Sequence, residues 1–388
     1  MESIMENNEL NLHVRSCIRV DDKLYFSEAY FNGLFVMDLK DFSISFICRF
    51  SEEYRGKLLL HGGNAIRYKE VIYFFPACTK RIHYYNFITK EENNIVIPFM
   101  QDNEEFVVSG VVKKDNKVWL FSANSSNSVF VLDMKENKIT KAEALSKMML
   151  SYKKTTNFIE IPKEGKAFTY CASDCVLLEI NVEKEQIKEH KIQIKSVSIV
   201  SVNYHNSKFY FTDAVSGDLY ELMWSNMNLR KFVAKDTEMD FMEGIPFTNC
   251  CFADDNIYMI PCRSKHVMKI NKNTGIMEQA FEYPEGFQFL NNVRTFYKPP
   301  IMLIVEIEHS KVWFYPYGSN QLLIYDTKSG QVTGKKMTIG IDKIFLHDGI
   351  MSENSPESLK YFCSSIGKNA EKVVSGDLQG KKIYQAIN

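Results

Sequence analysis

The stretch that decides the fold is KVWFYPYGSNQLLIYD, which runs from Lys311 to Asp326. It begins with a run rich in aromatic residues, continues through a short loop, and ends with a second apolar run. Runs of this length and composition are typical of β-strands, in which successive side chains point to opposite faces. The stretch therefore predicts a β-hairpin.

This hairpin pattern occurs seven times along the chain. The other copies span Lys23–Asp38, Val71–Asn86, Lys117–Asp133, Lys166–Asn181, Lys208–Met223 and Asn256–Asn271. In each copy an aromatic residue of the first run lies 13 or 14 residues before the last residue, whereas successive copies are 42 to 55 residues apart. A constant hairpin joined by connections of variable length explains both observations.

The end of each hairpin carries its own signal. Six copies end at Asp or Asn, whose short side chain can bond to the backbone just ahead and stabilise a turn. We expect Gly275 and Gly330, which follow two of these ends, to adopt positive φ. Met223 departs from the pattern, so the fifth copy is expected to use a different turn.

Each repeat has room for two further strands, such as 106–116 before the third hairpin and 43–50 after the first. Four strands in 40–50 residues are typical of a β-propeller blade. Over about residues 10–340 the chain resembles the β-propeller superfamily, in the broad sense of kelch and WD-repeat proteins. It has no regular Trp-Asp ending, and its only Gly-Gly pair is Gly62-Gly63, so the resemblance is one of architecture. It implies an all-β, seven-bladed propeller, with eight blades as the alternative.

The C-terminal region decides between seven and eight blades. Tyr361 lies 48 residues after Trp313, but no Asp or Asn ending follows it at the hairpin spacing. Ser355 and Pro356 instead suit the start of a helix, and apolar residues then recur with helical spacing. We therefore predict a propeller over residues 1–348 and a helical extension over 349–388 that packs on it.

Two other segments have a predicted role in the ring. Lys343–His347 is expected to form a last strand that helps to close it. Lys141–Tyr152 is either a helix inserted after the third hairpin or the outer strand and loop of that blade.

The amino-acid composition argues against some classes of binding partner. The chain has 47 basic and 48 acidic residues, without the basic excess that nucleic-acid binding usually requires. No stretch reaches the length of a membrane span, and the N-terminus lacks the features of a secretion signal. The nine cysteines do not have the spacing of zinc ligands, and we interpret them as reduced thiols that fill small spaces in a β core. We expect a cytoplasmic protein with no nucleic-acid or membrane partner, no metal and no cofactor.

Candidate ligand-binding residues lie in the hairpin loops, because propeller ligands usually bind on loops over the central channel. The candidates mix acids, bases, amides and aromatics: Tyr30, Arg81, Asn124, Asp174, Asp213, Arg263, His266, Tyr317 and Asn320. Such a set suits a polar ligand; the alternative is that these are ordinary solvated loop residues. His61, in HGGNA, stands beside glycines that let a backbone approach a ligand, or else belongs to a simple turn.

Two functions follow from this pattern. The first is a binding module for a peptide, a protein or a glycan on the loop face. The alternative is an enzyme, such as a lyase, hydrolase or cyclase, with a polar-substrate site at the channel mouth. Convergence of Arg81, Asp174, Asp213, Arg263 and His266 would favour the enzyme, and exposed Tyr30 and Tyr317 would favour a protein partner.

Overall fold

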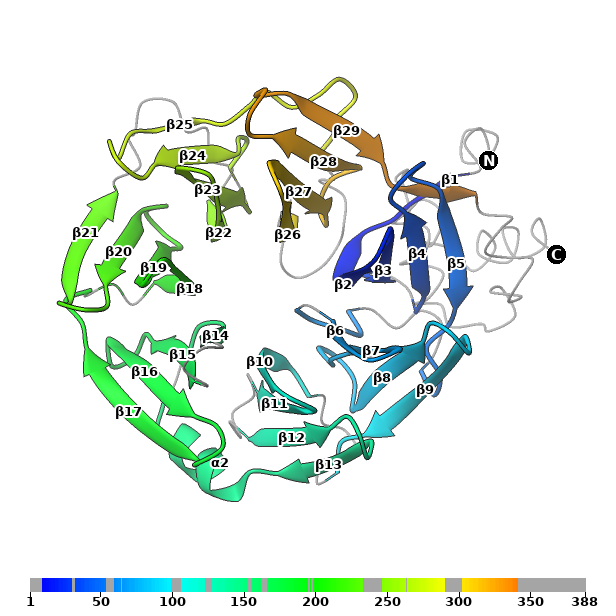
Figure 1. Ribbon diagram of the computed structural model, residues 1–388, viewed down its shortest axis with the longest axis horizontal. Helices are drawn as coiled ribbons and strands as arrows, with labels where there is room; N and C mark the ends of the chain where they lie inside the picture. The colour runs from blue at the N-terminus through cyan, green and yellow to red at the C-terminus, as the bar shows by residue number, and fades with distance from the viewer. Residues whose placement is uncertain are drawn as a thin grey trace, which may run out of the picture.

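The computed structural model describes residues 9–340 apart from 30–31, 54–58, 64, 99–105, 123–127, 153–154, 162–165, 195, 197, 233–245, 263 and 290–301. Seven four-stranded antiparallel sheets follow one another along the chain and form a closed ring (Figure 1). The protein is a seven-bladed β-propeller, and the predicted fold class is confirmed.

Within each blade the strands run in chain order from the centre of the ring to its edge (Figure 1). Blade 1 contains β2 (Val14–Val20), β3 (Lys23–Glu28), β4 (Leu34–Asp38) and β5 (Ile44–Cys48). Blade 2 contains β6 (Ile66–Tyr68), β7 (Val71–Phe74), β8 (Arg81–Asn86) and β9 (Glu91–Val96). Blade 3 contains β10 (Val108–Lys114), β11 (Lys117–Ser122), β12 (Val129–Asp133) and β13 (Lys138–Lys141). Blade 4 contains β14 (Ile159–Ile161), β15 (Lys166–Cys171), β16 (Val176–Asn181) and β17 (Gln186–Lys191).

The other three blades repeat the same order. Blade 5 contains β18 (Ile199–His205), β19 (Lys208–Asp213), β20 (Leu219–Met223) and β21 (Asn228–Phe232). Blade 6 contains β22 (Phe247–Ala253), β23 (Asn256–Pro261), β24 (Met268–Asn271) and β25 (Met277–Gln279). Blade 7 contains β26 (Met302–Glu308), β27 (Lys311–Pro316), β28 (Gln321–Asp326) and β29 (Val332–Lys336). All seven predicted hairpins are the two middle strands of a blade.

The predicted turn chemistry is present at the hairpin ends. Asp133 Oδ1 accepts hydrogen bonds from the backbone amides of Lys135 and Glu136 in the turn, at 2.9 and 3.2 Å. Gly275 and Gly330 have φ of 75° and 71°. After Met223 the turn is made differently, because Asn226 Oδ1 accepts from the amide of Asn228 at 3.0 Å.

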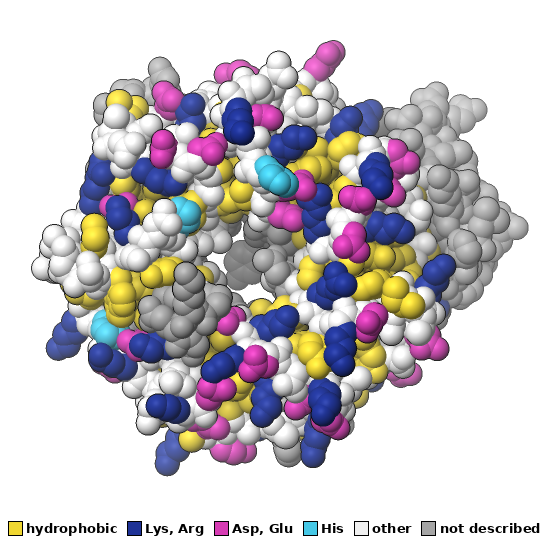
Figure 2. Space-filling view, in the orientation of Figure 1, with side chains coloured by type: hydrophobic (Ala, Val, Ile, Leu, Met, Phe, Trp, Pro, Cys, Tyr) yellow, Lys and Arg dark blue, Asp and Glu magenta, His cyan; other side chains and the backbone are white. Residues whose placement is uncertain are grey.

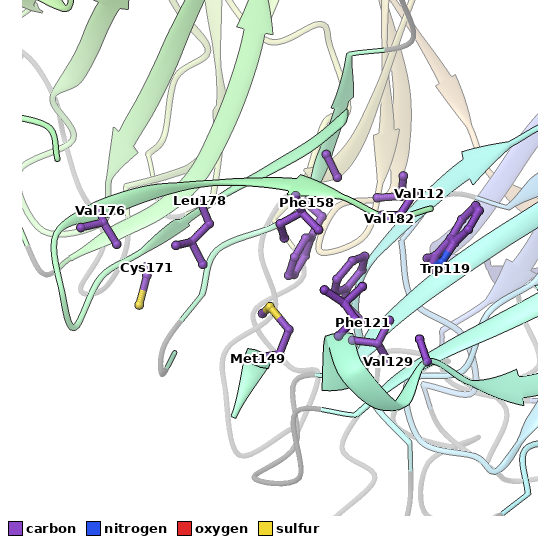
Figure 3. Close-up of a cluster of buried hydrophobic side chains, with 14 residues drawn as sticks. Val112, Trp119, Phe121, Val129, Met149, Phe158, Cys171, Val176, Leu178 and Val182 are labelled. Atoms are coloured by element: carbon purple, nitrogen blue, oxygen red, sulfur yellow. The ribbon is translucent and has the colours of Figure 1, made fainter. Parts of the chain in front are cut away.

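The core lies between blades, where the facing sheets bury their side chains against each other. Between blades 3 and 4 the rings of Phe121 and Phe158 stack with centroids 4.0 Å apart (Figure 3). Helix α2 (Glu143–Met149) adds Leu145 and Met149 to this cluster. The segment predicted as helix or strand is therefore a helix beyond β13, as expected for a run of residues with good helix propensity.

Two short strands join the ends of the described chain. Strand β1 (Glu9–Asn11) pairs antiparallel with β30 (Thr338–Gly340), and the amide of Leu12 donates to the carbonyl of Met337 at 2.7 Å. Leu12 and Met337 are buried in the cluster between blades 1 and 7. The predicted strand 343–347 and the predicted helical extension 349–388 lie outside the described residues. The described part of the chain contains no helix that is long and apolar enough to cross a membrane.

Candidate functional site

The hairpin loops and the connections between blades lie on one face of the ring, because the four strands of each blade alternate in direction. We call this side the loop face. Its hairpin loops are residues 29–33, 75–80, 123–128, 172–175, 214–218, 262–267 and 317–320. Viewed down the ring axis, the protein shows a central opening, and basic and acidic side chains are interspersed around it (Figure 2).

Arg81 is held inside blade 2. Its Nη1 lies 3.7 Å from Oε1 of Glu53, and the Thr79 hydroxyl donates a hydrogen bond to the same carboxylate. The amide of Arg81 in turn donates to Thr79 Oγ1 at 3.2 Å. The guanidinium therefore already has an acidic partner, in the connection between blades 1 and 2.

Asp213 organises the hairpin loop of blade 5. Its carboxylate accepts hydrogen bonds from the hydroxyls of Ser196 and Ser198 and from the backbone amides of Val215 and Ser216. Burial by itself would raise the pKa of Asp213, but these hydrogen bonds outweigh burial and lower it. The side chain is buried and its acceptor positions are occupied by its own loop.

Asp174 and His266 also have local contacts. Asp174 is exposed, and hydrogen bonds from the Cys171 thiol and the Ser173 hydroxyl lower its pKa. The backbone of His266 is bonded in both directions to the hydroxyl of Ser264, at 2.8 and 3.2 Å. Within the described part of the chain, the titratable candidates form no ion pair or hydrogen bond with one another.

The two candidates of blade 7 are buried. Asn320 Oδ1 accepts from the amide of Gln288 at 2.8 Å, and its Nδ2 donates to the carbonyl of Gly286 at 3.0 Å. Asn320 thus ties the hairpin loop to the connection from blade 6. Tyr317 is only 4 % exposed, so it offers little of the aromatic surface expected for a protein partner. The remaining candidates, Tyr30, Asn124 and Arg263, lie outside the described residues.

Sequence reasoning missed a polar junction where blades 7, 1 and 2 meet on the loop face. Arg15, near the start of β2, places its guanidinium over the ring of Tyr317 from blade 7, 5.5 Å from the ring centroid. Its Nε donates to the carbonyl of His61, in the connection to blade 2, at 2.9 Å. Figure 1 shows the innermost strands β26, β2 and β6 side by side around the centre. Arg15 therefore joins three blades.

His61 and His83 form a buried pair behind this junction. His61 Nε2 lies 2.9 Å from His83 Nδ1, and His83 Nε2 lies 3.1 Å from the carbonyl of Ser51. Because a carbonyl only accepts, His83 carries its proton on Nε2 and accepts on Nδ1. His61 then donates from Nε2, which leaves its buried Nδ1 as an acceptor with no donor among the described residues.

Both imidazoles are kept neutral. Burial, then the neighbouring His83 and Arg15, lower the pKa of His61 well below its usual value. Burial also lowers the pKa of His83, to about 4; the hydrogen bond to Ser51 opposes this shift and Arg81 adds to it. The pair is therefore a structural link at neutral pH. In blade 1, the amide and Nδ1 of His13 both lie 3.0 Å from Oε1 of Glu28, and both residues are buried.

No metal centre is apparent in the part of the chain that the structure describes, since no three His, Cys, Asp or Glu side chains there are grouped to hold one. The prediction of no metal and no cofactor stays a prediction. The eight cysteines that the structure describes are not in disulfide bonds.

The comparisons with known proteins agree on the fold. No protein-family model matches the chain, and no curated protein matches it either. Among solved structures it resembles virginiamycin B lyase from Staphylococcus aureus, with a TM-score of 0.55 and 13% identity over 80% of this chain and 96% of the lyase. It also resembles PorZ of Porphyromonas gingivalis, a bacterial surface component of the type-IX secretion system, with a TM-score of 0.55 and 9% identity over 85% of this chain and 39% of PorZ.

A third similar structure is the computationally designed protein Ika8, with a TM-score of 0.51 and 10% identity over 84% of this chain and 87% of that one. These identities are too low to carry an activity from one protein to another, and a propeller fold hosts many functions. The class of protein is therefore the seven-bladed β-propeller.

Proposed function

We propose that this propeller is a binding module that holds a peptide, a protein or a glycan on its loop face. The observation that carries the proposal is the state of the polar groups there. Asp213, the buried acid among the described candidates, is bonded to the serine hydroxyls and backbone amides around its own loop. By contrast, the terminal nitrogens of Arg15 have no hydrogen-bonding partner among the described residues.

This distribution favours binding over acid–base catalysis. A guanidinium donates several hydrogen bonds in a fixed geometry but does not exchange protons near neutral pH. The enzyme alternative needs titratable groups within contact of each other, and the described candidates do not converge in that way. We also propose that the module acts in the cytoplasm, where cysteines are usually reduced, as expected for eight described cysteines that are not in disulfide bonds.

The test combines ligand arrays with matched surface variants. Purified protein is applied to peptide and glycan arrays, and each ligand that binds is titrated against two variants. The first changes Asp174 and Val215, two exposed residues of the hairpin loops, to Ala and Ser. The second, the control, changes Lys135 and Lys184 on the opposite face to Ala; both residues are exposed.

The proposal expects binding that weakens in the loop-face variant and not in the control. Weakening only in the control, or the absence of any array ligand, would contradict it. Conversion of a bound ligand to a product, followed by mass spectrometry, would point to the enzyme alternative.

A further inference from the structure

We propose that Arg15 is the anchor for a carboxylate group of the ligand. This inference rests on the proposed function, since it names the chemistry recognised at the loop face. Each of its supports comes from the geometry around Arg15 and from the comparison with other blades.

The first support is the way in which the guanidinium is held. Its Nε is fixed to the carbonyl of His61 at 2.9 Å, and its Cζ lies over the ring of Tyr317, 5.5 Å from the ring centroid. Nη1 and Nη2 remain without a partner in the described part of the chain, and the residue is partly exposed. A fork of two parallel N–H donors on a pre-ordered plane matches the two oxygens of a carboxylate.

The second support is the space beside the guanidinium. Gly62 follows His61, and a Cβ built on Gly62 would lie 3.8 Å from Nη2 of Arg15 and 3.2 Å from Cβ of Ala77. A side chain at Gly62 would crowd Ala77 and reach contact distance of Nη2, so the glycine keeps this edge of the guanidinium clear of a side chain.

The third support is that the fold itself does not need an arginine at this position. Arg15 is the extra residue of a β-bulge between Val14 and Ser16. Strands β10, β18, β22 and β26 have the same bulge at the same place. The residues at these equivalent positions are all uncharged: Ser109, Val200, Thr248 and Leu303. The charge of Arg15 therefore serves something other than the bulge.

Arg19, on the same strand, shows what an internally satisfied arginine looks like. Its guanidinium also lies over an aromatic ring of blade 7, Trp313, at 5.6 Å. However, its Nη1 forms an ion pair with Oε2 of Glu308 at 2.6 Å. Arg15 has the ring but not the carboxylate. A carboxylate supplied by a ligand would complete the same arrangement on the loop face.

The experiment uses isothermal titration calorimetry with two acidic probes, a capped glutamate peptide and a galacturonate oligosaccharide. Their neutral counterparts are the glutamine peptide and the galactose oligosaccharide. The acidic probe that binds identifies the source of the carboxylate. R15Q is expected to weaken its binding by about tenfold or more, because a charge-assisted hydrogen bond is lost. R15K, which keeps the charge but not the fork, should fall between R15Q and the natural protein.

The control is R19Q, on the same strand, which is expected to bind like the natural protein. Thermal unfolding of R15Q and R15K shows whether both variants are folded. Equal binding of acidic and neutral probes, no binding of either acidic probe, or unchanged affinity in R15Q would overturn the inference. If a neutral ligand binds and only the Asp174 and Val215 variant weakens it, the carboxylate inference fails while the binding function stands.

Discussion

His61 Nε2 lies 2.9 Å from His83 Nδ1, in an interface between blades where both rings are fully buried. Neither ring has an acidic partner in this contact, and among the described residues the other side-chain hydrogen bond of the pair runs from His83 to the carbonyl of Ser51. Protonation of either ring would place a positive charge in an apolar surrounding that includes Phe50 and Phe74. The histidine pair therefore makes the stability of the propeller depend on pH.

We predict that the free energy of unfolding decreases as the pH falls from about 6.5 to about 4. In the unfolded chain a histidine has a pKa near 6.5, whereas burial lowers that of His83 to about 4 in the folded protein. Below pH 6.5 the unfolded state binds protons that the folded state does not, so acid favours unfolding. The stabilisation lost through His83 is at most about 3 kcal/mol. Urea denaturation at a series of pH values measures it.

H83Q tests the assignment of this effect to the pair. Glutamine keeps an amide N–H that can donate to the Ser51 carbonyl, but it does not titrate. The variant should be somewhat less stable at neutral pH and should lose less stability on acidification. An equal pH slope in H83Q and in the natural protein would show that the dependence comes from other groups.

Much of the propeller could be predicted from the sequence because its hairpins are local. The aromatic run, the loop and the Asp or Asn ending all lie within about 16 residues, and each is stabilised by contacts inside the hairpin. The turns that follow the innermost strands also have a sequence pattern, which is not part of the hairpin pattern. Two polar residues precede most hairpins, and Asp21, Asp115 and Asp254 among them have positive φ, as tight turns require.

The junction around Arg15 could not be predicted in this way. Arg15 and His61 are 46 residues apart, and Tyr317 belongs to the last blade. These residues meet only because the propeller closes into a ring, and no local sequence pattern indicates which residues that closure brings together. Asp213 and Asn320 are likewise predicted as ligand-binding residues because of their residue types. In the structure, however, their polar side-chain atoms form hydrogen bonds with the neighbouring loops and connections. Contacts between blades determine which polar loop residue keeps donors or acceptors that are available to a ligand.

Asp213 gives a second prediction. D213A removes the acceptor for two serine hydroxyls and two backbone amides in the hairpin loop of blade 5. We expect a loss of about 1–3 kcal/mol in the free energy of unfolding, because several part-buried hydrogen bonds to a charged acceptor are lost. The loss should shrink in acid: hydrogen bonding lowers the pKa of this carboxyl, so its contribution is present above the unfolded pKa and disappears as the pH falls through the folded one.

The matched control for Asp213 is D174A, at an exposed carboxylate in the hairpin loop of blade 4. Its effect on stability should stay within about 0.5 kcal/mol, as is usual for surface substitutions. If D213A were as mild as D174A, Asp213 would not be the organiser of its loop, and a direct role in ligand contact would become the better interpretation. Urea denaturation curves of both variants give the comparison.

Gly110 gives a third prediction, on the packing between blades 3 and 4. A Cβ at this position would lie 2.7 Å from the Cβ of Phe158 and 2.9 Å from its backbone nitrogen. G110A should therefore push Phe158 away from Phe121, on which it stacks, at a cost of about 1–3 kcal/mol. A variant as stable as the natural protein in thermal unfolding would mean that the two blades can separate slightly without loss.

The fourth prediction concerns Asn157, whose side chain joins blade 4 to blade 5. Its Nδ2 donates to the carbonyl of Val202 at 2.9 Å, and its Oδ1 accepts from the amide of the same residue at 2.8 Å. The amide thus pairs with β18 as another strand would. N157A leaves both backbone groups of the buried Val202 without this partner, so we expect a loss of about 1–3 kcal/mol.

N157D separates the two bonds made by Asn157. Aspartate keeps the acceptor for the Val202 amide but places a second acceptor against the Val202 carbonyl, so the variant should be no more stable than N157A at neutral pH. N93A, at an exposed position on the outer strand β9, is the control and should change stability by less than about 0.5 kcal/mol. All three are compared by urea denaturation with unchanged slope. If N157D matched the natural protein, the bond to the Val202 carbonyl would contribute nothing to stability, and the bond from the Val202 amide would account for the whole effect of N157A.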